Sequence, residues 1–230
     1  MAVSVVAGLG NPGTAYEDTR HNAGFMLLDA LAGEFGCSWA RDRKFDAWVA
    51  AHHWHGRRLY LVKPRTYVNR SGSCLNGFCG YYKLAASSMV VVYDEINLTI
   101  GRAKISIGGS AGGHNGVADI LRYFPNEFIR FRIGIGPKHP PEMELKDYVL
   151  GKLTARETEA LSGNMKGFLD GVKLLIDTGP QAAMNRVNQR PRENTEADET
   201  RPTNREQETE HEDDREKKIP GHGDSGHAGA

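Results

Sequence analysis

Two short apolar runs do most to limit the folds open to this chain. Residues 3–7 and 89–93 are almost wholly aliphatic or aromatic, and runs of this length are typical of strands buried on both faces. The first run ends in a Gly-Leu-Gly-Asn-Pro-Gly turn at residues 8–13, and the second ends at Asp94. The sequence therefore predicts two buried strands that each lead directly into a polar segment.

Helical and strand patterns alternate through the rest of the first 188 residues. Thr154 and Glu157 have the spacing of a capping box and open a long amphipathic helix over 154–177. Further helices are predicted over 22–35, 72–84, the later part of 113–123, and 180–187. Further strands are predicted over 46–54, 58–62, 102–107 and 128–135, of which the first two form a hairpin. The alternation favours a layered α/β fold with a mixed sheet.

The composition changes at residue 189. Residues 189–230 contain hardly any large apolar side chain except Ile219, so they cannot bury enough surface to offset the entropy of ordering. They carry 7 Lys and Arg against 12 Asp and Glu, a net charge of −5; because the whole chain has 29 of each, residues 1–188 carry +5. We predict a single domain over 1–188 and a disordered tail over 189–230. The basic domain suits a polyanionic partner but equally fits ordinary surface charge.

Cysteine usage and hydropathy indicate the compartment. The three cysteines, Cys37, Cys74 and Cys79, cannot all pair, and none has Cys-x-x-Cys spacing. No signal-peptide pattern is present at the N-terminus, and no apolar run approaches about 20 residues. The sequence therefore predicts a cytoplasmic protein without a membrane-spanning segment.

Residues 8–13 match Gly-x-Gly-x-x-Gly after a strand, which is the pattern of a dinucleotide-binding loop. Pro12 lacks the backbone N–H that would face a pyrophosphate, and polar residues 14–22 follow in place of a helix. No second strand ends in an acidic residue at the spacing that this pattern requires. Dinucleotide binding is therefore the weaker interpretation of the loop.

Polar segments carry the other candidate site residues. They contain His21 before the first helix, Asn69 after a strand, Asp94 at the end of a buried strand, and His114 with Asn115 after a glycine-rich run. A carboxylate at the end of a central strand is well placed to orient a histidine, and glycines let a substrate approach the backbone. Each segment also has a structural explanation, as a helix cap or as a turn.

Other kinds of site find no support. A Gly-x-Ser-x-Gly elbow is absent from the sequence, which argues against a serine acyl hydrolase. His52, His53 and His55 lie on a predicted hairpin, where alternation places His52 on the opposite face from the other two, and no carboxylate cluster follows. We expect neither a metal site nor a cofactor.

Taken together, these segments resemble the bacterial peptidyl-tRNA hydrolase family over roughly residues 3–188. Five motifs occur in order: Gly-Leu-Gly-Asn-Pro-Gly, Thr-Arg-His-Asn-x-Gly-Phe, Lys-Pro-x-Thr-Tyr-x-Asn-x-Ser-Gly, Asp-Glu and Gly-Gly-His-Asn-Gly. The resemblance implies a monomeric, three-layer α/β/α fold without an obligate protein partner. It also implies hydrolysis of the ester between a peptide and the 3′-terminal ribose of tRNA.

The resemblance carries roles over position by position. His21 matches the general base, and Asp94 matches the carboxylate that orients it. The residues implied to bind the substrate are Asn11, Tyr16, Tyr67, Asn69, His114 and Asn115. An activated ester needs only a positioned base, a water and oxyanion donors, so no metal is implied.

Three cations are assigned to tRNA phosphates, which position the nucleic acid without reading its sequence: Lys104, Arg132 and Lys138. Arg102 shares a predicted strand face with Lys104, and Arg130 shares one with Arg132. We therefore expect a basic surface over these two strands.

Three departures from the family pattern fall near the expected site. Val68 stands where Met is common, Asn97 where an acidic residue is common, and Ser106 where a basic residue is often present. The sequence leaves their effects open.

One alternative from another class is a noncatalytic RNA-binding scaffold of the same fold, and a second is a dinucleotide-dependent oxidoreductase. The complete set of polar site residues argues against lost activity: Asn11, His21, Asn69, Asp94 and Asn115.

Overall fold

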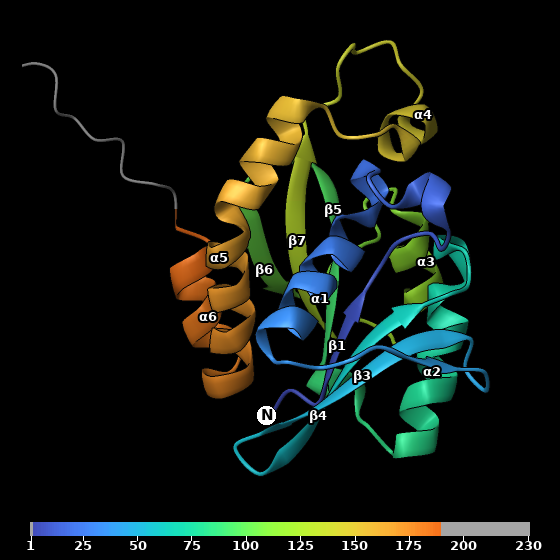
Figure 1. The fold of residues 1–230 in the computed structure, drawn as a ribbon, viewed down its shortest axis with the longest axis vertical. Coiled ribbons are helices and arrows are strands. Elements are labelled where there is room, and N and C mark those ends of the chain that lie inside the picture. The colour runs from blue at the N-terminus through green and yellow to red at the C-terminus, as the bar shows by residue number, and fades with distance from the viewer. Residues whose placement is uncertain (1, 190–230) are drawn as a thin grey trace, which may run out of the picture. The chain divides into compact units, whose positions relative to one another are not determined.

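The structure is a computed structural model that describes residues 2–189, so the predicted tail lies outside the described residues except for Gln189. The described residues form one seven-stranded sheet with helices on both faces (Figure 1). The strand order is β2-β3-β4-β1-β5-β7-β6. The predicted α/β/α fold with a mixed sheet is confirmed.

Four parallel strands form the centre of the sheet. They are β4 (Arg57–Pro64), β1 (Val5–Gly8), β5 (Met89–Thr99) and β7 (Ile129–Gly136). Antiparallel strands complete it: β2 (Ala40–Asp42) and β3 (Ala47–Trp54) beside β4, and β6 (Ala103–Ile107) beside β7. Because β1 and β5 are parallel neighbours, the segments that follow them meet at one edge of the sheet.

The helices divide between the two faces. One face packs against α1 (Ala23–Glu34), α5 (Ala155–Thr178) and α6 (Pro180–Val187) (Figure 1). The other face packs against α2 (Ser71–Tyr82) and α3 (Asn115–Leu121). Along β5, Val90 and Val92 enter the first core while Val91 and Tyr93 enter the second. The continuous apolar run therefore supplies two cores at once, as expected for a strand buried on both faces.

Short elements complete the chain. A six-residue helix, α4 (Leu145–Leu150), follows the loop after β7. Single 3₁₀ turns occupy Thr14–Tyr16, Arg20–Asn22, Val68–Arg70 and Ala86–Ser88. Within the described part of the chain, no helix is long and apolar enough to cross a membrane.

The structure differs from the predicted elements in three places. β5 extends to Thr99, past the predicted end at residue 93, because its polar second half still pairs with β7. Short β2 and α4 were not predicted, since neither contains enough residues to show a period. The expected basic surface is also wrong in part, because Arg130 of β7 is buried.

Gly24 sets how closely α1 approaches the ends of β1 and β5. A Cβ at this position would lie 2.4 Å from the carbonyl oxygen of Val92 and 2.6 Å from that of Leu9. We expect Gly24→Ala to displace α1 and to lower the free energy of unfolding by about 1–3 kcal/mol, measured by urea denaturation. Gly33→Ala in the same helix is the matched control, because a Cβ there meets nothing within 4 Å. The control should gain about 0.4–1 kcal/mol, and equal stability of the two variants would contradict the packing constraint.

Candidate functional site

A cavity of 560 Å³ lies where the segment after β1 meets the polar second half of β5. All eight residues predicted to be catalytic or to bind the substrate line it: Asn11, Tyr16, His21, Tyr67, Asn69, Asp94, His114 and Asn115. The cations assigned to phosphates, Lys104, Arg132 and Lys138, do not line it. The structure therefore gathers one predicted set into a single cavity and leaves the other outside it.

His21 and Asp94 form a buried pair. His21 lies in the 3₁₀ turn after β1, and Asp94 lies within β5, beyond its apolar first half. The two side chains are 8% and 3% exposed, and His21 Nδ1 lies 2.9 Å from Asp94 Oδ1. Because an ionised carboxylate only accepts hydrogen bonds, Nδ1 carries the proton and donates it.

His114 contacts the same carboxylate oxygen. Its Nε2 lies 3.0 Å from Asp94 Oδ1, and its Nδ1 accepts the backbone N–H of Val117 at 3.2 Å. His114 is thus the N-cap of α3, as its place before a predicted helix suggested. Since Nδ1 accepts, Nε2 must be the protonated nitrogen that donates to Asp94. Both nitrogens of His114 are therefore engaged.

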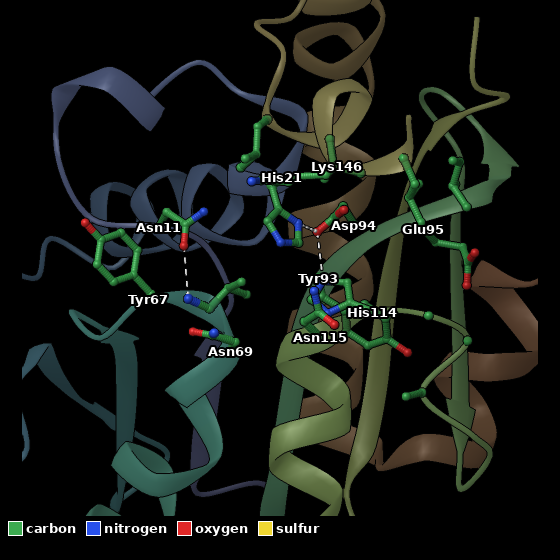
Figure 2. Close-up of a pocket in the computed structure, with 18 of the residues that line it drawn as sticks. Asn11, His21, Tyr67, Asn69, Tyr93, Asp94, Glu95, His114, Asn115 and Lys146 are labelled. Atoms are coloured by element: carbon green, nitrogen blue, oxygen red, sulfur yellow. Dashed lines mark hydrogen bonds and ion pairs between the residues drawn. The ribbon is translucent and has the colours of Figure 1, made fainter. Parts of the chain in front are cut away.

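His21 keeps one nitrogen available. Its Nε2 makes no hydrogen bond to any residue within 2–189 and faces the cavity between Asn69 and Asn115 (Figure 2). With Nδ1 protonated, Nε2 holds a lone pair that can accept a proton. Of the two histidines in the cavity, only His21 is therefore arranged as a base.

The charges of the pair shift both pKa values. Burial by itself lowers the pKa of His21, but the charge of Asp94 and the hydrogen bond to it outweigh burial and raise that pKa above 6.5. Burial by itself raises the pKa of Asp94, but the two imidazoles, by charge and hydrogen bonding, hold it well below its usual range. Asp94 therefore stays ionised wherever His21 titrates.

The same three residues also have the composition of a small metal site. The ligand atoms of His21, Asp94 and His114 all lie within 4.8 Å of one another. Both histidine nitrogens that face Asp94 carry protons in the hydrogen-bonded arrangement, so a cation could enter only by displacing them. The arrangement suits proton transfer without such a displacement.

Asn11 presents a donor to the cavity. Its Oδ1 accepts the backbone N–H of Val68 at 3.0 Å, which leaves the Nδ2 group for a ligand (Figure 2). The loop that holds it is fixed by Asn22, whose amide bonds to both the N–H and the carbonyl of Asn11 at 2.8 and 3.0 Å. Asn22 was not among the site residues predicted from the sequence, although it stands beside His21 in the same motif.

One wall of the cavity was not predicted. Four residues of α4 form it: Leu145, Lys146, Val149 and Leu150. The three apolar side chains suit an apolar group, and Lys146 adds a cation. None of the five motifs described above includes a residue of α4, so the sequence offered no signal for Lys146.

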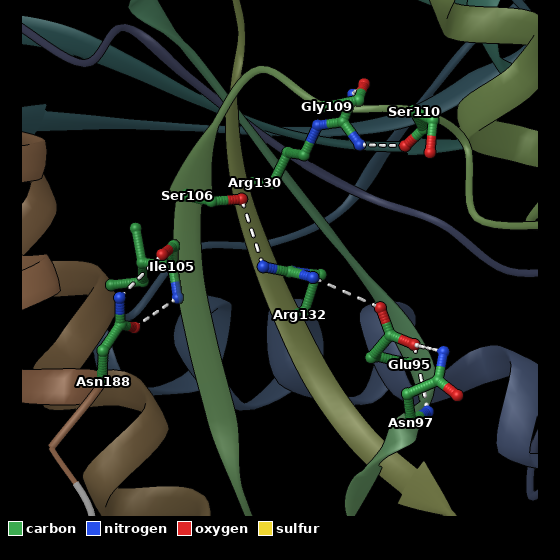
Figure 3. Close-up of polar contacts among 9 residues, drawn as sticks. All are labelled: Glu95, Asn97, Ile105, Ser106, Gly109, Ser110, Arg130, Arg132 and Asn188. Carbon is green, nitrogen blue, oxygen red and sulfur yellow. Dashed lines mark hydrogen bonds and ion pairs between the residues drawn. The ribbon is translucent and has the colours of Figure 1, made fainter.

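The cations assigned to phosphates are arranged unequally. Lys104 is exposed and lies directly opposite Arg132 across the β6–β7 pair, so the two share a face. Arg132 donates to Glu95 at 3.4 Å and to Ser106 Oγ at 3.3 Å (Figure 3). Lys138 lies in the loop after β7 and donates to the carbonyl of Met143.

Arg130 is not part of an exposed basic surface, contrary to expectation. Its guanidinium lies beside Gly109 and Ser110, to whose carbonyl oxygens it donates (Figure 3). It also donates to Asn126 Oδ1. It therefore holds the glycine-rich loop that leads to His114. The glycine-rich loop and Asn126 lie against this side chain, so the buried guanidinium finds its partners inside the protein.

The three departures from the family pattern have local consequences. Val68 is buried on the cavity wall, and its N–H fixes Asn11. Asn97 donates its backbone N–H and its side-chain amide to Glu95, each at 3.0 Å, in place of a second acidic group. Ser106 accepts a hydrogen bond from Arg132. In place of the basic residue often present in the family, Ser106 thus orients a basic residue of the neighbouring strand.

Residues 5–196 match the family model described as peptidyl-tRNA hydrolase, which extends past the predicted domain boundary at 188. A peptidyl-tRNA hydrolase of Gloeobacter violaceus is 39% identical over 191 residues, which cover 83% of this chain and 96% of that protein. One from Rubrobacter xylanophilus is 41% identical over 184 residues, covering 80% and 99%. The crystal structure of peptidyl-tRNA hydrolase from Acinetobacter baumannii matches with a TM-score of 0.77 and 36% identity, covering 81% of this chain and 94% of that chain.

The titration of His21 tests its electrostatic environment. Asp94→Asn removes the charge and leaves burial, so we expect the pKa of His21 to fall from above 6.5 to below it, measured by NMR titration of the imidazole. In the parent protein, protonated His21 contributes to the stability of the fold below pH 6.5, because its pKa is higher in the folded state than in the unfolded state. This contribution is lost as the pH rises through the pKa of His21 in the folded state. The variant should lack that dependence. An unchanged midpoint in a folded variant would show that Asp94 does not control His21.

Proposed function

This chain belongs to the peptidyl-tRNA hydrolase family, and we propose that His21, oriented by Asp94, is the general base of its reaction. The chain hydrolyses peptidyl-tRNA, releasing free tRNA. The observation that carries the catalytic assignment is the hydrogen bonding of the two histidines: His114 has both nitrogens engaged, while Nε2 of His21 faces the cavity. This arrangement favours catalysis over a noncatalytic scaffold of the same fold.

The reaction needs one proton to move twice. His21 Nε2 takes a proton from water, and the oxygen of that water attacks the ester carbonyl. Asp94 stabilises the imidazolium that forms, because its carboxylate stays ionised and accepts the hydrogen bond from Nδ1 throughout. When the bond between the carbonyl carbon and the ribose oxygen breaks, the imidazolium returns the proton to that oxygen. The products are a peptide with a free carboxyl group and tRNA.

The ester carbonyl needs hydrogen-bond donors as it gains negative charge. Asn11 Nδ2 is suited to this role because the oxygen of the same amide is already bonded to Val68. Asn69, on the same side as Asn11, and Asn115, across from them, also line the cavity and complete a polar surround for the ester and the water (Figure 2). The apolar wall of α4 is suited to a peptide side chain, and Tyr16 and Tyr67 extend the lining.

The tRNA is assigned to the face of β6 and β7. Lys104 is the exposed cation there, and Arg132 beside it is already paired with Glu95, so Lys104 is the stronger of the two candidates. Lys138 is bonded to a backbone carbonyl and stays a prediction as a third contact. Action in the cytoplasm, as a monomer and without an obligate protein partner, also stays a prediction from the sequence and the family resemblance.

The dinucleotide alternative has no support in the fold. The glycine-rich turn after β1 is followed by two 3₁₀ turns, and α1 begins only at Ala23. The turn therefore does not place a helix N-terminus against the position a pyrophosphate would take.

Removal of the base tests the catalytic assignment. We expect His21→Ala to lower kcat by about 10²–10⁴-fold, or about 3–5 kcal/mol of barrier, while the variant keeps its fold and its affinity for tRNA. Asp94→Asn should lose less, because His21 can still act. Single-turnover hydrolysis of an N-acetylaminoacyl-tRNA measures both, with the unblocked aminoacyl-tRNA as the substrate control.

The parent rate should increase with pH, with a midpoint above 6.5, since only neutral His21 is a base and its pKa is raised. This increase of the rate with pH should be absent from the His21→Ala variant. Turnover near the parent level in His21→Ala would exclude the residue as the base.

The basic face of β6 and β7 gives a second test. Lys104→Ala should weaken tRNA binding and flatten the dependence of log Kd on log salt by about 1 unit, and it should spare hydrolysis of a minimal ester substrate. Arg43→Ala is the matched control: it also removes an exposed cation, but follows β2 at the opposite edge of the sheet. An equal effect of the two substitutions would mean that net charge, and not this face, attracts tRNA.

A further inference from the structure

Arg20, the residue before His21, has a buried guanidinium with a defined partner. Nε donates to Glu157 Oε1 at 2.9 Å and Nη2 donates to Glu157 Oε2 at 2.7 Å, which is a bidentate pair. The two side chains are only 11% and 19% exposed. An ion pair with this geometry and burial orients its partners far more strictly than an exposed pair does.

The same guanidinium also holds α4. Nη1 donates to the carbonyl of Tyr148 at 3.2 Å, and the central carbon of the guanidinium lies 4.5 Å from the centre of the Tyr148 ring. Tyr148 is the buried residue of α4, whereas its neighbours Lys146 and Val149 line the cavity. Arg20 thus contacts the inner side of the helix that forms one wall of the site.

Backbone hydrogen bonds also join the segment around Arg20 to the segment that follows α4. The N–H of Arg20 donates to the carbonyl of Gly151 at 3.2 Å, and the N–H of Leu153 donates to the carbonyl of Asp18 at 2.9 Å. A Cβ at Gly151 would lie 2.9 Å from Arg20 Nη1, so the guanidinium fills the space beside the end of α4. Backbone hydrogen bonds and the packed guanidinium therefore hold the segment with His21 against the segment between α4 and α5.

Glu157 is itself fixed by a second role. It forms the capping box of α5 with Thr154, whose N–H donates to Oε2 at 2.7 Å. Burial alone would raise the pKa of Glu157, but hydrogen bonds from Arg20 and Thr154 lower it, so the carboxylate stays ionised. The pair thus connects the turn before α1 with the first turn of α5.

We propose that Arg20 and Glu157 are positioning residues, which fix the turn carrying His21 and the α4 wall in one relative arrangement. The proposal rests on the proposed function, because it assigns this arrangement a role in the hydrolysis. Neither residue lines the cavity, so both act through His21 and α4. Loosening the pair should disturb the base and the substrate wall together.

Two conservative substitutions test the pair. Glu157→Gln keeps an oxygen for the Thr154 cap but removes the charge, and Arg20→Lys keeps the charge but removes the bidentate geometry. We expect each to lower kcat by about 10- to 100-fold, since small misplacements of a reacting group have effects of this size, and to raise KM through α4. Arg20→Lys should retain more activity than Arg20→Gln.

The pH profile separates positioning from stability. Asp94 and His114 contact His21, while Glu95 and Lys146 line the same cavity. If the pair holds His21 against Asp94, the midpoint of the acid limb should move to lower pH in Glu157→Gln. The NMR titration of His21 should move in the same direction, and this measurement does not depend on activity.

Glu34→Gln is the matched control. It breaks the ion pair with Lys173 that joins the same helix, α5, to α1, outside the cavity. We expect it to lower thermal stability slightly and to leave kcat, KM and the pH profile unchanged.

Parental kinetics and parental His21 titration in folded Glu157→Gln and Arg20→Lys would overturn the proposal, as would equal losses in Glu34→Gln. Either result leaves the proposed function intact if His21→Ala is inactive. An active His21→Ala would instead refute the catalytic assignment, and the His21 titration would still decide whether the pair orients the imidazole.

Discussion

Asp94 Oδ1 accepts a hydrogen bond from each of two imidazole rings, at 2.9 Å from His21 and 3.0 Å from His114. The carboxylate is buried, so it has little water to compete for these bonds and must be satisfied by the protein. Three elements depend on it: β5 carries the oxygen, the turn after β1 brings His21, and the start of α3 brings His114. The parallel pairing of β1 with β5 makes the convergence possible, and Gly24 lets α1 come close enough to keep the turn in place.

Polar side chains fix the remaining loops around this centre. Asn22 binds both backbone groups of Asn11, Arg130 binds the carbonyls of the glycine-rich loop, and Arg20 joins the His21 turn to α4. Loops at strand ends bury few apolar groups, so their backbone donors and acceptors must be satisfied by side chains of this kind. A cavity lined by loops can then hold reacting groups in place as a rigid scaffold would.

Residue type and local period predicted a large part of the molecule. The strands at 3–7 and 89–93, the capping box at Thr154 and the mixed α/β layers all follow from patterns within a few residues. The patterns failed where partners far along the chain decide the outcome. β5 continues past its apolar half because β7 pairs with it, and Arg130 is buried because the glycine-rich loop lies against its guanidinium. Lys146 belongs to none of the five motifs, so its place in the cavity became visible only in the folded chain.

The sequence by itself determined which residues are chemically able to act: two histidines, one strand-end carboxylate and three asparagines in ordered motifs, all of which line one cavity. Residue type alone could not distinguish the two histidines, and only the family resemblance assigned them different roles. The tertiary structure gives the two rings different hydrogen bonds. When α3 packs beside β5, the N–H of Val117 donates to Nδ1 of His114, and Nε2 of the same ring donates to Asp94. Among the described residues, the imidazole of His21 bonds only to Asp94, through Nδ1. The protonation of each ring is therefore set by long-range contacts, because a tautomer depends on which donors and acceptors surround a side chain and not on its type.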